Sequence, residues 1–180
     1  MANTPSVDPC VVRCLTRVSD AEIEQLAALL IDCVAAGASV SFMHPLPRAK
    51  AQAFWRDIAA GAARGERALL VAQGAHGIVG TVQLILAQPE NQPHRADLAK
   101  LLVLPHARRR GIGAALMRGA EGVARQRGKS LLVLDTASSE AQRLYANLGW
   151  RACGVVPGYA LLPHGGLCDT TFFFRDLIPE

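Results

Sequence analysis

Residues 101–117 read LLVLPHARRRGIGAALM, and this stretch decides the kind of fold that the chain can adopt. An apolar run typical of a strand ends at Pro105, three arginines follow, and Gly111 and Gly113 open a segment with helical periodicity. The glycines permit a tight turn and leave the backbone accessible to a ligand. The first helical turn has about four unpaired N–H groups at the positive end of the helix dipole. This order of elements predicts a binding site for a phosphate or pyrophosphate.

The stretch differs from two other phosphate-binding sequences. No lysine and serine or threonine follow the last glycine, as in a Walker A loop, and the full GxGxxG dinucleotide fingerprint is absent. The remaining pattern is RxxGxG, between the strand LAKLLVLP and the helix IGAALMRGAEGVARQRG. The alternative interpretation is an ordinary strand-to-helix turn with a solvated basic face.

With these residues the chain resembles the GNAT superfamily of acyl-CoA-dependent N-acetyltransferases, in which a Q/R-x-x-G-x-G/A segment holds the pyrophosphate of acetyl-CoA. The resemblance implies an α/β GNAT fold, with a mixed central sheet of about six to seven strands flanked by about four helices. It implies acetyl-CoA as co-substrate, no metal, and a backbone N–H that a bulge frees to polarise the thioester. The residues it assigns to acetyl-CoA are Leu102, Val103, Leu104, Arg108, Arg109, Arg110, Gly111, Ile112, Gly113 and Ala114, the first three being those near the bulge.

Length and composition favour one folded unit. The chain has 180 residues, of which 51% are hydrophobic and 19% charged, enough to bury one core. We expect a single domain over residues 1–180 with its core at about 11–176. No apolar run approaches the ~18 residues of a membrane span, and MANTPSVDPC is unlike a signal peptide, so we expect a cytoplasmic protein without a membrane partner. The five scattered cysteines favour neither a disulfide framework nor a zinc site.

Positive charge is concentrated around the RxxGxG segment. Residues 100–129 hold eight basic side chains against one acidic one, whereas the net charge of the whole chain is only +4. Such a patch attracts phosphates, and CoA carries both a pyrophosphate and a ribose phosphate. Nucleic acid is the rival ligand, but we do not expect it as a partner, because no aromatic residues interleave with the basic ones.

Alternating elements are predicted along the chain. Strands are expected at 11–17, 68–73, 78–86, 96–104, SLLVLDT (130–136), 152–156 and 170–176, with SLLVLDT parallel to the strand before it. Helices are expected after a capping box of Ser19 and Glu22, after Pro47, from the paired glycines, and after a cap of Ser139 with Gln142. The terminal apolar strand, 170–176, is a hypothetical pairing surface for a homodimer.

Acetyl transfer to an amine requires a proton donor for the departing thiolate and a neutral amine. The resemblance assigns the donor to Tyr145, because AQRLYANLGW matches a family pattern A-x-x-L-Y-x-x-x-G-F. A tyrosine with only a packing role is the alternative. Asp135, at the end of a buried strand, is the candidate general base or orienting group, and its alternative is a structural hydrogen bond. Asp97, which matches an acid common in the family, and a water chain remain open as other bases.

A narrower resemblance extends over most of the chain. GASVSFM, HRADLAKLLVLP, LLVLDT and VVPGYALLPHG look like segments of the tabtoxin-resistance acetyltransferases, which acetylate a β-lactam amino-acid toxin. The connection between Asp135 and Tyr145 is shorter than in that pattern. The resemblance implies a pocket that includes Phe42, His44 and Tyr159, and with Asp97 these are the candidate substrate-binding residues. A surface-loop histidine is the alternative for His44.

The expected activity is therefore acetyl transfer from acetyl-CoA to a primary amine of a small molecule, such as an amino-acid-like or β-lactam toxin, by direct attack on the thioester. Such an enzyme would act in antibiotic or toxin resistance. The alternatives are acetylation of a protein N-terminus or of aminoacyl-tRNA, and a non-catalytic acyl-CoA-binding sensor. The sensor would have no need of Tyr145 and Asp135.

Overall fold

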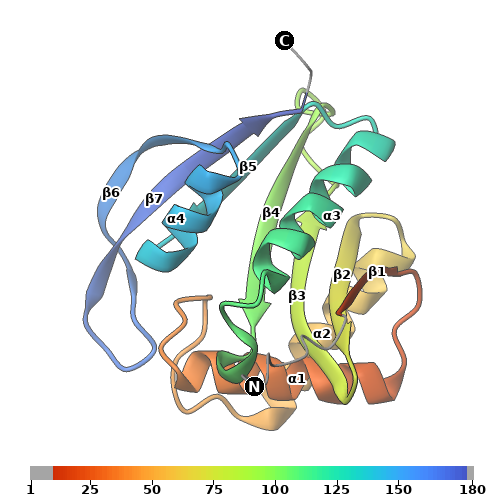
Figure 1. Cartoon of the computed structure of the whole chain (residues 1–180), viewed down its shortest axis with the longest axis vertical. Coiled ribbons are helices and arrows are strands. Elements are labelled where there is room, and N and C mark those ends of the chain that lie inside the picture. Colours follow the sequence, from red (N-terminus) through yellow and green to blue (C-terminus); the bar gives the residue numbers. More distant parts are fainter. Residues whose placement is uncertain (1–9, 178–180) are drawn as a thin grey trace, which may run out of the picture.

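The computed structural model describes residues 10–177, which form a seven-stranded sheet with four α-helices (Figure 1). The strand order across the sheet is β1-β2-β3-β4-β5-β7-β6. Its strands are β1 (Val11–Leu15), β2 (Arg67–Gly74), β3 (Gly77–Ile85), β4 (Arg95–Val103), β5 (Leu131–Thr136), β6 (Arg151–Leu161) and β7 (Leu167–Asp176). Its helices are α1 (Asp20–Ala35), α2 (Arg48–Ala63), α3 (Ile112–Gln126) and α4 (Ser139–Asn147), with a 3₁₀ turn at Pro105–Ala107. The expected α/β fold class is confirmed.

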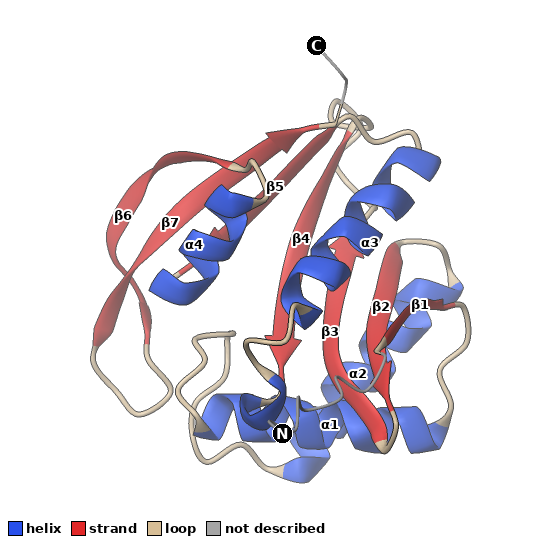
Figure 2. Cartoon of the chain, viewed as in Figure 1, coloured by secondary structure: helices blue, strands red, loops and turns tan. Residues whose placement is uncertain are grey.

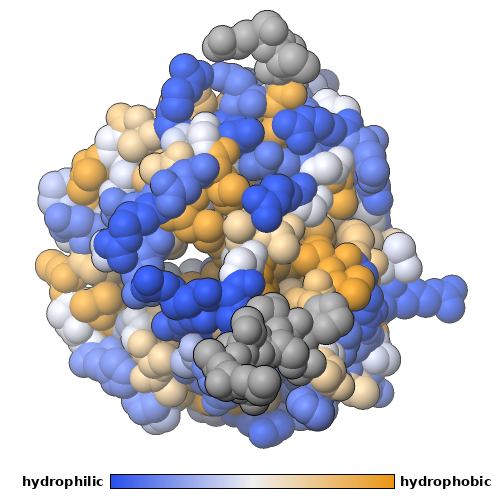
Figure 3. Space-filling model, in the orientation of Figure 1, coloured by the Kyte–Doolittle hydropathy of each residue, from blue (hydrophilic) through white to orange (hydrophobic). Residues whose placement is uncertain are grey.

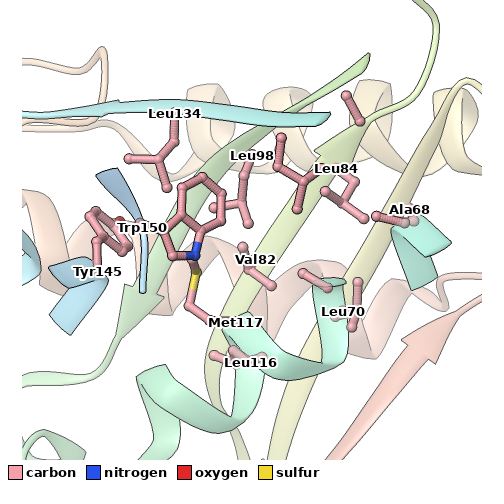
Figure 4. Close-up of a cluster of buried hydrophobic side chains, with 14 of the residues drawn as sticks. Ala68, Leu70, Val82, Leu84, Leu98, Leu116, Met117, Leu134, Tyr145 and Trp150 are labelled. Carbon is pink, nitrogen blue, oxygen red and sulfur yellow. The ribbon is translucent and has the colours of Figure 1, made fainter. Parts of the chain in front are cut away.

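Two helices cover each face of the sheet (Figure 2). On one face α3 and α4 pack over a cluster that includes Leu84, Leu116 and Trp150 (Figure 4). On the other face α1 and α2 bury a second cluster around Leu26 and Trp55. The centres of both clusters are shielded from water, since Leu26, Trp55, Leu84 and Leu116 have no exposed surface. The sheet therefore divides the interior into two cores.

The helix starts follow local chemistry. Ser19 and Glu22 form the expected capping box of α1, in which each side chain accepts a hydrogen bond from the other's backbone N–H. The expected cap of α4 is wrong by one residue. Ser138, not Ser139, is the N-cap, and its hydroxyl accepts a hydrogen bond from the N–H of Ala141. A serine pair leaves the choice open in sequence, because either hydroxyl can serve as a cap.

The two last strands are longer than expected, and their places correct the dimer hypothesis. β6 and β7 extend to Leu161 and from Leu167, so most of the expected loop between them is a hairpin. β7, the terminal apolar strand, lies inside the sheet between β5 and β6 and has no free edge. β6 is the edge strand instead, and its exposed side chains include Val155 and Val156. Residues 171–174 of β7 pair with both β5 and β6, so this stretch offers no free edge for the hypothesised pairing across a dimer.

β4 and β5 are parallel, as predicted, but they pair over only three positions, from Arg95 opposite Leu131 to Asp97 opposite Val133. Beyond Asp97 the strands diverge, as Figure 1 shows between the green β4 and the blue-green β5. The remaining polar backbone groups on these two facing edges are thus open to a ligand. None of the helices formed by the described residues has the length and apolar character of a membrane span.

Candidate active site

The space between the diverging strands is a cavity of about 520 Å³. Its walls come from β4, the end of β5, the starts of α3 and α4, and the segment after α1. In Figure 3 this face of the molecule is hollowed, with strongly hydrophilic residues along one side of the hollow. We call this space the splay cavity.

The start of α3 forms one wall of the splay cavity. Gly111, the N-cap, has a φ of 78°, a left-handed conformation that disfavours a side chain. The first hydrogen bond within the helix is donated by Ala115 to the Gly111 carbonyl, so the N–H groups of residues 112–114 have no helical acceptor. These three residues line the cavity together with Arg108 and Arg109. The wall is thus an array of donors with positive charge, suited to a pyrophosphate.

Arg110 and Leu104 do not line the splay cavity, although they belong to the acetyl-CoA residues expected from the sequence. Arg110 is exposed outside it. Leu104 donates its N–H to the carbonyl of Val79 on β3, at 2.9 Å. Its backbone is therefore already paired inside the sheet.

The expected bulge in β4 exists but lies earlier than residues 102–104. The register against β3 shifts between Thr81, opposite Leu102, and Gln83, opposite Ala99, which leaves Lys100 and Leu101 opposite Val82. Lys100 has a φ of 54°. A bulge of this kind bends a strand and redirects its side chains.

Val103 presents its backbone to the splay cavity. Its carbonyl accepts hydrogen bonds from Arg108 Nε at 3.2 Å and Cys33 Sγ at 3.5 Å, neither of which belongs to β3. Because backbone groups alternate between the two edges of a strand, the N–H of Val103 points to this same edge, while Leu102 faces β3. Of the three expected thioester-polarising residues, only Val103 has the required direction. Leu101, in the bulge, also lines the cavity and was not among the expected residues.

A second cavity of about 250 Å³ adjoins the first. The residues that line both cavities are Ser39, Asp135 and Ala137, so the two cavities meet there. The smaller one, which we call the outer cavity, is also lined by the expected substrate residues Phe42 and Tyr159. The rest of its wall consists of Ser41, Met43, Ala160, Leu161 and Thr170. It is largely uncharged apart from Asp135.

Tyr145 lies at the inner end of the site. It is only 4% exposed, and its ring packs edge-on against Phe173 with ring centroids 5.6 Å apart, beside Trp150 (Figure 4). It lines the splay cavity. Burial, and secondarily the negative charge of Asp135, raise the pKa of Tyr145 well above its usual range. Its phenol therefore stays protonated at neutral pH and can act as a proton donor.

Asp135 and Lys100 face each other across the diverging strands. The last residues that pair β4 with β5 are Asp97 and Val133. Asp135 lies two residues after Val133, and Lys100 lies three residues after Asp97. Asp135 is exposed at the cavity wall, yet the surrounding protein displaces enough water to raise its pKa, against the opposing effect of the Lys100 charge. Desolvation lowers the pKa of Lys100, and the Asp135 charge counteracts it. Lys100 was missed in the sequence, where a single lysine within an apolar strand was the available signal.

Two of the expected substrate residues are not brought to these cavities. Asp97 forms an ion pair with Arg95, at 3.3 Å, below the point where the strands diverge. His44 lines neither cavity, and its ring lies against that of His164 with centroids 4.7 Å apart. Within residues 10–177, no group of three His, Cys, Asp or Glu side chains is arranged to hold a metal ion.

A family model described as "Acetyltransferase (GNAT) family" matches residues 31–150, two thirds of the chain. The chain belongs to the GNAT acetyltransferases. The matched range extends from α1 through α4 and so includes the start of α3, Asp135 and Tyr145.

Solved structures of several acetyltransferases have the same fold. An N-acetyltransferase from Staphylococcus aureus Mu50 is 18% identical, with a TM-score of 0.78 over 94% of this chain and 99% of that one. A ribosomal-protein-alanine N-acetyltransferase from Brucella melitensis is 21% identical, with a TM-score of 0.75 over 92% and 99%. A phosphinothricin acetyltransferase from Sinorhizobium meliloti, solved in complex with acetyl-CoA, is 19% identical, with a TM-score of 0.75 over 93% and 88%.

Proposed function

We propose that this protein transfers an acetyl group from acetyl-CoA to a primary amine of a small molecule, by direct attack of the amine on the thioester. The observation that carries this proposal is the junction of the two cavities at Asp135. One cavity has a donor-rich, cationic wall suited to the phosphates of CoA, and the other is a small space for an acceptor. A reacting pair would meet where the cavities join.

The residues of the splay cavity fit acetyl-CoA. A Cβ at Gly111 would meet no protein atom within 4 Å, so the space beside it is free for a phosphate group. The N–H groups of residues 112–114 and the guanidinium of Arg108 would hold the pyrophosphate. A backbone N–H at Leu101 or Val103 would polarise the thioester carbonyl, as an oxyanion-hole donor does.

Asp135 and Tyr145 would move the protons. The carboxylate of Asp135 would accept the proton of the incoming ammonium, and its raised pKa makes it a stronger base than an ordinary aspartate. The phenol of Tyr145 would give its proton to the sulfur as the thiolate leaves. The raised pKa of the phenol means that it is protonated at neutral pH.

The acceptor cavity favours a small molecule over a protein segment. At about 250 Å³ the outer cavity is below the usual range for a drug-sized ligand, and the α1–α2 segment and the β6–β7 hairpin border it. An amino-acid-like or β-lactam toxin, as the tabtoxin-resistance resemblance implies, would be of suitable size. The likeness to the phosphinothricin acetyltransferase agrees with such a substrate only loosely. A role in toxin resistance is part of this proposal.

The second candidate is acetylation of a protein N-terminus. It is favoured by the likeness to the ribosomal-protein-alanine N-acetyltransferase, at 21% identity. An N-terminal residue with a small side chain would also enter the outer cavity. Aminoacyl-tRNA is a less favoured acceptor of the same kind, and a non-catalytic sensor would have no use for the paired Asp135 and Tyr145.

The deciding experiment is calorimetric titration with acetyl-CoA, followed by thiol release against amino acids, polyamines, β-lactam amino acids and short peptides. Binding with turnover on a small amine is expected. Turnover on peptides alone would replace the proposal with the second candidate. Binding without any turnover would support the sensor, and no binding would refute the acetyl-CoA site.

A further inference from the structure

Lys100 occupies an unusual position for a lysine. It lies in the bulge of β4 with a φ of 54°, and it is one of three non-glycine residues in the described part of the chain with a positive φ, the others being Ser41 and Arg109. Such backbone conformations cost about 1–3 kcal/mol each and persist where the surrounding structure holds them. All three residues line the two cavities. Backbone strain is thus concentrated at the candidate site.

Two of these strained residues, Lys100 and Ser41, are joined by a hydrogen bond between their side chains. Lys100 Nζ donates a hydrogen bond to Ser41 Oγ at 3.1 Å, which joins β4 to the segment between α1 and α2. Lys100 lines the splay cavity and Ser41 lines the outer cavity. The ammonium therefore sits near the border of the two. It also lies 6.0 Å from the centroid of the Phe54 ring.

The ammonium of Lys100 has no anionic partner among residues 10–177. The six ion pairs of this part of the chain leave Lys100 out. Asp135 is close enough to influence its pKa, yet it forms no ion pair with it. A half-buried cation of this kind loses hydration and gains only the influence of Asp135, with which it forms no ion pair, so an anion from a ligand would stabilise it further.

We propose that Lys100 and Ser41 form a subsite for a carboxylate that the acceptor molecule carries close to its amine. This inference rests on the proposed acetyl transfer and names its substrate class. The ammonium of the acceptor would lie against Asp135, and its carboxylate would lie against Lys100 Nζ and the Ser41 hydroxyl. Because the two charged side chains face each other without touching, a zwitterion fits between them with both of its charges opposed.

The subsite defines which amines are accepted. In a free α-amino acid the ammonium and the carboxylate are attached to the same carbon. Such a molecule would place its ammonium against Asp135 and its carboxylate against Lys100 at the same time. Polyamines, aminoglycosides and lysine side chains of proteins have no carboxylate beside the amine, and they would leave Lys100 without its anion. A buried group left unpaired is a strong basis for discrimination.

The test compares each L-amino acid with the amine that its decarboxylation gives, such as leucine with 3-methylbutylamine and methionine with 3-(methylsulfanyl)propylamine. Binding in the presence of CoA and thiol release with acetyl-CoA are measured for the wild type and for Lys100→Gln. Lys50→Gln is the matched control, because Lys50 Nζ lies at a similar 5.8 Å from an aromatic ring, that of Phe42, but is exposed and lines neither cavity.

We expect the wild type and Lys50→Gln to prefer the carboxylate member of at least one pair by about 30-fold or more, the range for a charged hydrogen-bonded contact. Lys100→Gln should lose that preference, so that its activities on the two members of the pair come within about threefold of each other. Equal losses on both members, or no carboxylate preference in the wild type, would overturn the subsite. Carboxylate-dependent binding without turnover would uphold the subsite and refute the acetyl transfer instead.

Discussion

Tyr145 shows how a single side chain is prepared for one task. Its ring is packed among Phe173 and Trp150, which fixes its position, and its burial keeps the phenol protonated. The same ring contacts thus fix the position of Tyr145 and shield its phenol from water. A tyrosine with a packing role alone would have no need to reach the cavity.

Replacement of Tyr145 by Phe tests the proton donor. We expect kcat to fall about 10²-fold or more, because a positioned general acid contributes roughly that factor. The dissociation constant of acetyl-CoA should change little, since the ring and its contacts remain. Steady-state kinetics and calorimetry measure the two quantities. Equal effects on kcat and on acetyl-CoA affinity would assign Tyr145 to binding.

Asp135→Asn tests the base. In the wild type we expect kcat/KM to rise with pH through the raised pKa of Asp135, because only the ionised carboxylate accepts a proton. The variant should be about 10²-fold slower at neutral pH and show only the ionisation of the amine itself. A pH profile of the variant that keeps both ionisations would show that another group is the base.

The same aspartate has a stability effect of known sign. A folded-state pKa above the unfolded value means that ionisation disfavours the folded state, so wild-type stability falls as pH rises from the unfolded pKa through the folded one. Asp135→Asn should therefore be more stable relative to wild type at neutral pH than at about pH 3, below both pKa values. Thermal melts across this range measure the difference. A difference that does not depend on pH would contradict the raised pKa.

At the scale of an element, two glycines of α3 have different proposed roles: Gly111, its N-cap, and Gly122, in its interior. Gly111 needs its left-handed conformation, whereas Gly122 lies inside the helix with open space where a Cβ would stand. Both glycines belong to the same segment of sequence. Their roles differ because one starts the helix at the cavity and the other faces away from the sheet.

Gly111→Ala and Gly122→Ala form a matched pair. We expect Gly111→Ala to lose about 1 kcal/mol of unfolding free energy through backbone strain and to bind acetyl-CoA about tenfold more weakly. Gly122→Ala should gain about 0.5–1 kcal/mol from higher helix propensity, with unchanged acetyl-CoA affinity. Chemical denaturation and calorimetry test both. Tight acetyl-CoA binding by Gly111→Ala would show that the backbone there is not approached by the ligand.

The elements differ in how well they could be predicted. The capping box of Ser19 and Glu22 and the glycine-opened α3 depend on neighbours in the sequence, so their positions were predicted correctly. The length of β6 was underestimated because nearly all of its side chains are exposed, which removes the alternation that marks a half-buried strand. The bulge at Lys100 arises from pairing between β3 and β4, and no local pattern encodes it.

The residues of the candidate site also differ in how well they could be predicted from the sequence. Phe42, Asp135, Tyr145 and Tyr159, expected from the sequence, all line the cavities. Asp97 does not, because strand pairing keeps it below the divergence of β4 and β5. Ser41 belongs to the segment 39–44 that was expected to line the pocket, but Lys100 was missed, since its contact with Ser41 depends on how the α1–α2 segment folds over the sheet.

At the scale of the whole molecule, charge is unevenly distributed. The region from residue 100 to residue 129 has a net charge of +7, while the rest of the chain is net negative. Its arginines include Arg108 and Arg109, at the splay cavity. The field around this region should draw CoA toward the site before any contact is formed.

Salt should therefore weaken the binding of acetyl-CoA. We expect its dissociation constant to rise by roughly five- to tenfold between about 0.05 and 0.5 M NaCl, because the Debye length falls below the spacing of exposed charges. Dephospho-CoA, which lacks the ribose phosphate, should show a weaker dependence. Calorimetry at several salt concentrations measures both slopes. An affinity that is independent of salt would remove the positive patch from the recognition of CoA.

The two cavities differ in whether the elements that form their walls also form the hydrophobic core. The splay cavity is built from β4 and α3, whose other faces form the core, whereas the outer cavity is bordered by the α1–α2 segment and the exposed β6–β7 hairpin. In the segments 39–43 and 159–161, all residues except Val40 and Phe42 lie outside the two core clusters and can change with little effect on the core. The enzyme is in this sense modular: a combinatorial library confined to those two segments would redirect the choice of amine while keeping the fold and the acetyl donor.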